Sequence, residues 1–151
     1  RTPTMRMTGK RFGCNMISAI TNRGTLNFMV FRGRFNTSVY LDFLQRLVRQ
    51  ARRKVFLIVD GHPSHKSAAT QQWIAQNAQR IQQFLLPAYS PELNPDELLN
   101  QDVKTNAVGR RRAYNVDELV GNVRGYLRGT QKQPQVVQNY FQAEHVRYAA
   151  Q

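Results

Sequence analysis

A five-residue apolar run, residues 55–59, ends directly in the acidic residue Asp60. A run of this length predicts a buried β-strand, and open α/β sheets bind their ligands at the carboxyl ends of the strands. Asp60 is therefore a candidate for presenting a carboxylate at the edge of a sheet. The plainer alternative is an Asp that begins an ordinary Asp-Gly turn.

A second acidic residue, Glu97, ends a segment with three prolines, Leu-Pro-Ala-Tyr-Ser-Pro-Glu-Leu-Asn-Pro-Asp-Glu at 86–97. Asn94 and Pro95 predict the start of a helix, with Asn as its cap and Pro at its first position. Glu97 also has the spacing of a capping box, in which it would bond back to the cap. A rigid loop fixes where the helix begins, which favours a ligand role for Glu97. Carboxylates from a strand end and a helix start suit hard divalent cations such as Mg²⁺ or Mn²⁺.

Other polar residues lie close to Glu97 in the sequence. Asp96 is its neighbour, but adjacent helical positions point about 100° apart, so we do not expect both acids to face one ion. Asn100, Gln101 and Lys104 fall on the same predicted helix face as Glu97 and form a polar stripe that can reach DNA beside the ions. Lys104 is equally compatible with simple solvation.

Two histidines, His62 and His65, follow Asp60 closely. Their spacing could hold a transition metal, but we do not expect a structural zinc site, because the chain has only three histidines and its single cysteine, Cys14, lies far from this pair in the sequence. We expect instead that they bond to Asp60 or to a phosphate, or that they are solvated turn residues. The lone cysteine also excludes a disulfide within the chain.

Positive charge is unevenly distributed along the chain, whose formal net charge is +13. Residues 1–59 carry +11, residues 60–109 carry −2 and residues 110–151 carry +4. An acidic centre between basic segments fits carboxylates that hold metal and basic side chains that hold phosphate, so nucleic acid is the expected partner. A basic surface with no ligand is the alternative.

The size of the chain, 151 residues with 41% hydrophobic content, is enough for one domain with a core. No apolar run approaches the roughly 20 residues of a membrane span, and the first residues lack the layout of a secretory signal. We therefore expect a cytoplasmic protein, associated with the bacterial nucleoid if it acts on DNA. Because the chain begins at Arg1 and its first ten residues read as mid-protein sequence, we also expect a piece of a longer protein.

Strand and helix patterns alternate along the chain, which predicts an α/β fold with a mixed sheet flanked by helices. Alternating apolar residues on both sides of a turn at 21–24 predict a β-hairpin. Asn36 or Thr37 can cap the next helix, whose apolar residues recur at helical spacing. The further expected elements are a strand at 55–59, a helix at 67–79, a strand at 81–86, a helix at 94–107, a basic connector at 109–112 and helices at 116–128 and 135–142.

The segment from Lys54 to Lys104 resembles the catalytic domain of insertion-sequence DDE transposases allied to the mariner elements. The likeness rests on the apolar strand with Asp60-Gly-His-Pro-Ser-His, on the run Tyr-Ser-Pro-Glu-Leu-Asn-Pro-Asp-Glu that ends at Glu97, and on Lys104. The resemblance implies a ribonuclease H-like fold that lacks its first strand. It implies a catalytic core at residues 1–108, with 109–151 as a basic connector and C-terminal helices of the same domain.

By the same resemblance, Asp60 is the second and Glu97 the third catalytic and metal-binding acid of the family. Such enzymes hold two Mg²⁺ or Mn²⁺ ions for phosphodiester hydrolysis and strand transfer at transposon ends. The family's first Asp lies on a strand before the hairpin, whereas the only acid before Asp60 here is Asp42, inside a predicted helix. We therefore expect the first ligand to be absent and this chain to be inactive alone. Relatives often carry Trp where this chain has Asn100.

The implied partners are DNA at the inverted repeats of the transposon ends and target DNA, and the resemblance leaves open whether the functional unit is a homodimer. The expected DNA contacts are Arg49, Arg52, Arg53, Lys104, Arg110, Arg111 and Arg112. Residues expected to support the metal ligands are His62, His65, Asn94 and Gln101.

Two alternatives to a transposase core remain. A non-catalytic DNA-binding or assembly module could keep the fold and the basic surface. Another nuclease of this fold, such as a Holliday junction resolvase or a ribonuclease H, is disfavoured by the proline-rich run before Glu97.

Overall fold

The computed structural model describes residues 4–6, 13–87 and 95–142. These residues form two compact units, which we name after the acid that each contains. The Asp60 unit consists of residues 35–87, and the Glu97 unit consists of residues 4–6, 13–34 and 95–142. The division that the sequence suggested, after residue 108, remains a prediction.

An antiparallel sheet forms the first half of the Glu97 unit. Its strands are β1 (Thr4–Arg6), β2 (Gly13–Ile20) and β3 (Leu26–Phe31), and they lie side by side in the same order as in the sequence. The predicted β-hairpin is confirmed by the pairing of β2 with β3. Its turn needs a glycine, because Gly24 has a φ of +97° and a Cβ there would lie 2.7 Å from the Pro134 carbonyl oxygen.

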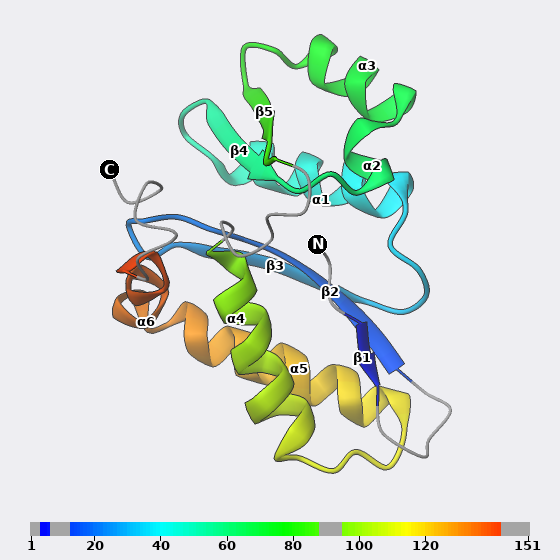
Figure 1. Ribbon diagram of the computed structural model, residues 1–151, viewed down its shortest axis with the longest axis vertical. Coiled ribbons are helices and arrows are strands. Elements are labelled where there is room, and N and C mark those ends of the chain that lie inside the picture. The colour runs from blue at the N-terminus through cyan, green and yellow to red at the C-terminus, as the bar shows by residue number, and fades with distance from the viewer. Residues whose placement is uncertain (1–3, 7–12, 88–94, 143–151) are drawn as a thin grey trace. The chain divides into compact units, whose positions relative to one another are not determined.

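Helices cover this hairpin in the Glu97 unit. Both α4 (Asp96–Val103) and α5 (Val116–Gln131) pack against it, as Figure 1 shows. A π-helical segment, η2 (Lys104–Gly109), continues α4, while α6 (Pro134–Asn139) and a 3₁₀ turn, η3 (Tyr140–Gln142), follow α5. The fully buried side chains of the unit include Met16, Leu26, Leu99, Leu119 and Leu127. No helix in the described parts of the chain is both long and apolar enough to cross a membrane.

The predicted helix at 94–107 is confirmed with different ends. It begins at Asp96, directly after Pro95, and its helical course continues to Gly109. The predicted cap, Asn94, lies outside the described residues. The last two predicted helices are also present, and α5 begins where the Asn115 side chain accepts a hydrogen bond from the Glu118 amide at 2.8 Å.

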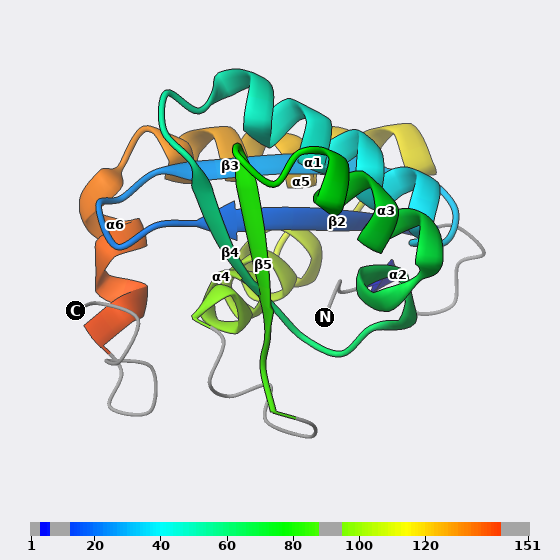
Figure 2. The same cartoon turned by 90° about the horizontal axis from the view of Figure 1, so that it is seen from above.

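The Asp60 unit contains two parallel strands and three helices. Helix α1 (Thr37–Gln50) comes first, and its predicted cap is Asn36, whose side chain accepts from the Val39 amide at 3.0 Å. The paired strands are β4 (Val55–Val59) and β5 (Ile81–Leu85), which run side by side in Figure 2.

The helix predicted at 67–79 is confirmed as α3 (Ala68–Gln76), and a short helix that was not predicted, α2 (Pro63–Lys66), precedes it. Ser67 separates them because its backbone is extended and its side chain accepts from the Thr70 amide at 3.3 Å, which makes it the cap of α3. The prediction missed this cap because Ser67 was assigned to the helix itself.

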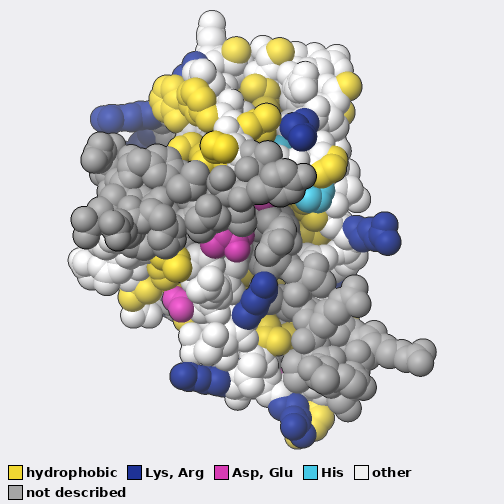
Figure 3. Space-filling model, viewed as in Figure 1, with side chains coloured by type: hydrophobic (Ala, Val, Ile, Leu, Met, Phe, Trp, Pro, Cys, Tyr) yellow, Lys and Arg dark blue, Asp and Glu magenta, His cyan; other side chains and the backbone are white. Residues whose placement is uncertain are grey.

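In place of the single expected mixed sheet, the described strands form two small sheets, one in each unit. The strand predicted at 55–59 is confirmed as β4, but its predicted burial is wrong for Phe56, which is 63% exposed, and for Ile58. Phe56 and Ile58 alternate with more buried residues in β4, and Phe84 of β5 pairs with Ile58, so one face of the pair β4–β5 carries three exposed apolar side chains. Figure 3 shows hydrophobic side chains gathered over this part of the surface.

Candidate active site

Asp60 follows the last residue of β4, as the sequence predicted, and lies at the carboxyl end of the parallel pair. Its carboxylate is held by local donors. The backbone amide of His62 donates to Asp60 Oδ1 at 3.0 Å, and His65 Nδ1 lies 3.1 Å from the same oxygen. The Asp60 side chain is 18% exposed, so it is partly shielded but still reachable from solvent.

His65 is the most closely packed of these partners. Its Nδ1 also lies 2.9 Å from the Asp60 carbonyl oxygen, so both nearby atoms are acceptors and Nδ1 must carry the proton. Burial lowers the pKa of His65 to about 4, which keeps the ring neutral at physiological pH. A neutral Nδ1–H tautomer therefore orients Asp60 without adding a positive charge beside it.

Two further residues fix the segment that carries His65. The Gln83 side chain donates to the His65 carbonyl oxygen at 2.9 Å, and the Tyr40 hydroxyl bonds to Gln83 Oε1. Burial raises the pKa of the Tyr40 hydroxyl, so this group stays protonated and donates. The rings of Tyr40 and His65 also pack at a centroid distance of 4.5 Å. The sequence patterns did not single out Gln83, although a polar residue in a short strand was a usable signal.

His62 plays a different part from His65. Its Nδ1 accepts from the Ser64 amide at 3.0 Å and caps α2, so a neutral His62 ring carries its proton on Nε2. Burial, followed by the nearby His65, lowers the pKa of His62. The backbone of His62 supports Asp60 while its side chain supports the turn.

Glu97 lies in the first turn of α4, where a helix favours negative charge. Asn100, which is buried, donates from Nδ2 to Glu97 Oε1 at 3.4 Å. The neighbouring Asp96 has another partner, because both its carboxylate oxygens accept from the Ser18 hydroxyl of β2, at 2.7 and 2.9 Å. Burial raises the pKa of Asp96 to about 7. The two acids thus have different hydrogen-bond partners.

The predicted DNA contacts are solvent-exposed, as a phosphate-binding side chain must be. Arg49 lies in the last turn of α1, and Arg52 and Arg53 follow the helix, all in the Asp60 unit. In the Glu97 unit, Lys104 begins η2, and three consecutive arginines, at 110–112, follow η2. These exposed residues of the Glu97 unit are Lys104, Arg110, Arg111 and Arg112, with Gln101 also exposed nearby.

The carboxylate groups of Asp60 and Glu97 are the type of ligand that hard divalent cations prefer. Both residues offer carboxylate oxygens, and each carboxylate is oriented by at least one side-chain or backbone N–H donor. Among residues 4–6, 13–87 and 95–142, no three His, Cys, Asp or Glu side chains gather into one potential metal site. Asp42, the one acid that precedes Asp60, is exposed on α1 and lies 3.5 Å from Arg46.

Comparison with known proteins gives a family and a fold. Residues 1–120 match the family model of the DDE superfamily endonucleases. An uncharacterized 39 kDa protein of insertion element IS630 from Shigella sonnei is 29% identical over 94 residues. That match covers 61% of this chain and 27% of the relative, so the chain spans about a quarter of that protein's length.

Two solved structures share the fold. The catalytic domain of the Mos1 mariner transposase superposes with a TM-score of 0.66 at 14% identity, covering 100% of this chain and 80% of that one. The catalytic core domain of BIV integrase gives a TM-score of 0.62 at 14% identity, covering 97% and 95%. These similarities confirm the predicted ribonuclease H-like fold class. With the match over residues 1–120, they show that this chain belongs to the DDE superfamily of endonucleases.

Proposed function

We propose that this chain is the catalytic-core portion of a DNA transposase, which hydrolyses phosphodiester bonds and transfers strands at the ends of a mobile element. The observation that supports it most is the strand-end carboxylate of Asp60, oriented by the His62 amide and a neutral His65, in a member of this endonuclease family. Strand ends are where α/β sheets place their reacting groups.

In this proposal Asp60 and Glu97 hold divalent ions, Mg²⁺ or Mn²⁺, as members of the family generally use divalent metals. Two such ions, when bound, activate the attacking oxygen and stabilise the leaving oxygen of a phosphodiester. His65 keeps the Asp60 carboxylate in one orientation, and Asn100 does the same for Glu97. The exposed basic residues of both units neutralise the phosphates of transposon-end and target DNA, in the bacterial cytoplasm.

We also propose that the chain does not cleave DNA by itself. A complete site needs a third acid, and the only acid before Asp60, Asp42, belongs to α1 and faces Arg46. Purified chain should leave supercoiled plasmid intact in Mg²⁺ and in Mn²⁺, and nicking that disappears in Asp60→Asn would contradict this part of the proposal.

A non-catalytic DNA-binding module is the second candidate, favoured by the absence of a three-residue metal group in the described residues. The variant Asp60→Asn/Glu97→Gln separates the two functions. If the pair binds metal, Mn²⁺ raises the melting temperature of the wild-type chain and not that of the double variant. If the chain is a non-catalytic module, Mn²⁺ has the same effect on both.

A further inference from the structure

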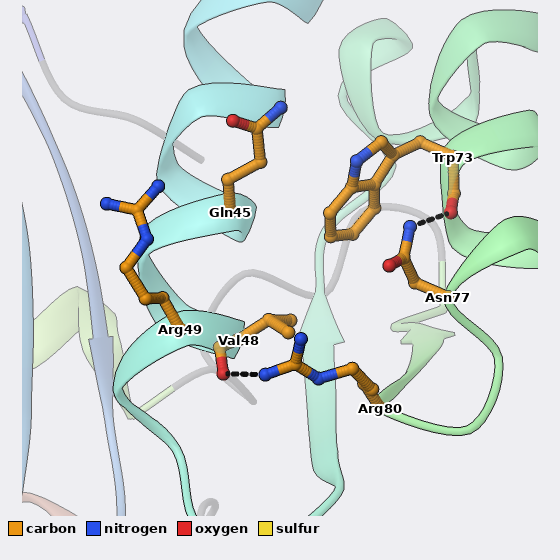
Figure 4. A pocket seen from close by; sticks show the side chains of 6 residues that line it. All are labelled: Gln45, Val48, Arg49, Trp73, Asn77 and Arg80. Carbon is orange, nitrogen blue, oxygen red and sulfur yellow. Dashed lines mark hydrogen bonds between the residues drawn. The ribbon is translucent and has the colours of Figure 1, made fainter.

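A pocket in the Asp60 unit lies outside the candidate active site. It is formed between α1 and α3 and has a volume of about 310 Å³, at the lower end of the range for small-molecule sites. Figure 4 shows its six lining residues: Gln45, Val48 and Arg49 from α1, Trp73 from α3, and Asn77 and Arg80 from the turn that follows. The pocket is lined mainly by polar groups around one aromatic ring.

Its charge favours an anion. Arg80 donates to the Val48 carbonyl oxygen at 2.9 Å, which holds its guanidinium between α1 and the turn that follows α3 (Figure 4). Arg49 also lines the pocket and is exposed, and in Figure 4 its guanidinium points away from Trp73, so it adds positive charge at the rim. The acids in residues 35–87 are Asp42 and Asp60, and neither lines the pocket. Two cations without a lining carboxylate make a site for phosphate.

Its other lining residues favour a flat heteroaromatic group beside that phosphate. The Trp73 ring is half-buried and faces Gln45 across the pocket in Figure 4, so a planar group can stack on it. Asn77 Nδ2 donates to the Trp73 carbonyl oxygen at 2.8 Å, which leaves Asn77 Oδ1 as an acceptor. With the Gln45 amide, this gives hydrogen-bonding groups of the kind that read the edge of a base.

We propose that this pocket binds one unpaired nucleotide of a DNA strand, with its base on Trp73 and its phosphate on Arg49 and Arg80. Stacking on an aromatic ring beside basic side chains is how proteins hold single-stranded nucleic acid. Duplex DNA is excluded because its base faces are already stacked. The proposal rests on the proposed function only in taking DNA as the partner, and it adds a site for a strand whose end has been opened.

Trp73 is the only tryptophan in the chain, so its fluorescence reports this pocket directly. Short oligothymidylate should quench that fluorescence in a saturable way. Arg49→Gln and Arg80→Gln should each weaken the apparent affinity about tenfold, because each removes one positive charge that attracts the phosphate. Arg46→Gln is the matched control, because it removes one charge from α1 outside the pocket and should change the affinity less than twofold.

Further ligands separate the sources of binding. A strand of the same length with abasic sites should not quench Trp73, and free thymidine monophosphate should quench it only at much higher concentration. Equal quenching by the abasic strand, or no quenching by oligothymidylate, would overturn the proposal. Arg80→Gln removes a hydrogen bond to α1, so its circular dichroism spectrum should be compared with that of the wild-type chain. If Arg80→Gln unfolds, the affinity of Arg49→Gln tests the proposal alone.

The outcome is independent of the metal site. Metal-dependent stabilisation through Asp60 and Glu97 can be present while Trp73 fluorescence ignores DNA, in which case only the pocket proposal fails. Quenching that persists without metal-dependent stabilisation would overturn the proposed chemistry and leave the pocket proposal standing.

Discussion

The two acidic residues of the candidate site are held by different kinds of local structure. Asp60 follows a strand and is oriented by groups close in sequence, the His62 amide and the His65 ring. Glu97 begins a helix, where the helix itself favours a carboxylate and Asn100 lies one turn away. Each unit therefore prepares its own acid through its own contacts.

The same comparison extends to the buried titratable group beside each acid. Burial lowers the pKa of His65 to about 4, which keeps its ring neutral at physiological pH, and raises that of Asp96 to about 7, which leaves its carboxyl group partly protonated there. His65 directs its Nδ1 proton at the Asp60 carboxylate. Asp96 instead accepts a hydrogen bond from the Ser18 hydroxyl of β2, so its environment differs from that of Glu97. A neutral His65 leaves the negative charge of the Asp60 carboxylate uncompensated.

The largest expected effect concerns DNA binding by the basic residues of the two units. Replacing Arg49, Arg52 and Arg53 by Gln, or Arg110, Arg111 and Arg112 by Gln, should each lower affinity for duplex DNA roughly a hundredfold at 0.1 M salt. The slope of log K against log salt should fall by about 2 to 3, because three phosphate contacts are lost. Fluorescence anisotropy over a salt series measures both.

The control for that experiment removes the same amount of charge elsewhere. Arg23, Arg128 and Lys132 are exposed and outside the proposed contacts, so their replacement by Gln should leave the slope nearly unchanged. If only one of the two sets of three arginine replacements weakens binding, then only one unit contacts DNA, and the two units do not share this function.

The next effect is acid destabilisation of the Asp60 unit. Folded His65 has its pKa depressed below 6.5, so the stability it contributes is complete above pH 6.5 and is lost as pH falls toward 4. At pH 5 the loss should be about 2 kcal/mol. Urea unfolding followed by Trp73 fluorescence, at pH 7 and pH 5, measures it, and His65→Gln should remove this difference.

Asp96 should show the opposite sign in the Glu97 unit. Its pKa is raised above 3.8, so its contribution is complete below pH 3.8 and is lost as pH rises through about 7. Amide hydrogen exchange resolves the units separately. Equal pH slopes for β4 and for α4 would show that the two groups do not act locally.

The smallest effect is the loss of one hydroxyl. Ser18→Ala should destabilise the Glu97 unit by about 1 to 2 kcal/mol near neutral pH, since the Asp96 carboxylate loses its hydroxyl donor, and should raise the pKa of Asp96 further. Hydrogen exchange of β2 and α4 amides measures the change. Ser38→Ala, at an exposed serine of α1, is the control and should change nothing measurable. Protection that falls equally in β4 would argue against separate units.

The parts of this fold that local patterns determine could be predicted from the sequence. The hairpin followed from alternating residues around the turn at 21–24, and α1 followed from apolar residues at helical spacing after its cap, Asn36. The strand that ends just before Asp60 followed from the apolar run at 55–59. The contact between His65 and Asp60 was among the expected alternatives because the two are five residues apart.

What could not be predicted depends on contacts between distant residues or on competing local bonds. The bond from the Tyr40 hydroxyl to Gln83 joins residues 43 positions apart, and no periodicity indicates it. Ser67 caps α3 with its own side chain, and α2 before it spans only four residues, which is too short for a periodic pattern to indicate. The exposure of Phe56 depends on which face of β4 the helices of its unit cover, and an apolar run alone does not distinguish the faces.

The account depends most on Asp60 and Glu97 sharing bound metal although they belong to different units. The direct test is a titration of the ¹⁵N-labelled chain with Mn²⁺, whose unpaired electrons broaden the amide signals of nearby residues. We predict that the signals of Gly61 and Glu97 weaken at the same Mn²⁺ concentration, that Mg²⁺ restores both, and that Asp60→Asn abolishes both effects. Broadening at only one of the two positions, or broadening at Glu97 that survives Asp60→Asn, would contradict the account.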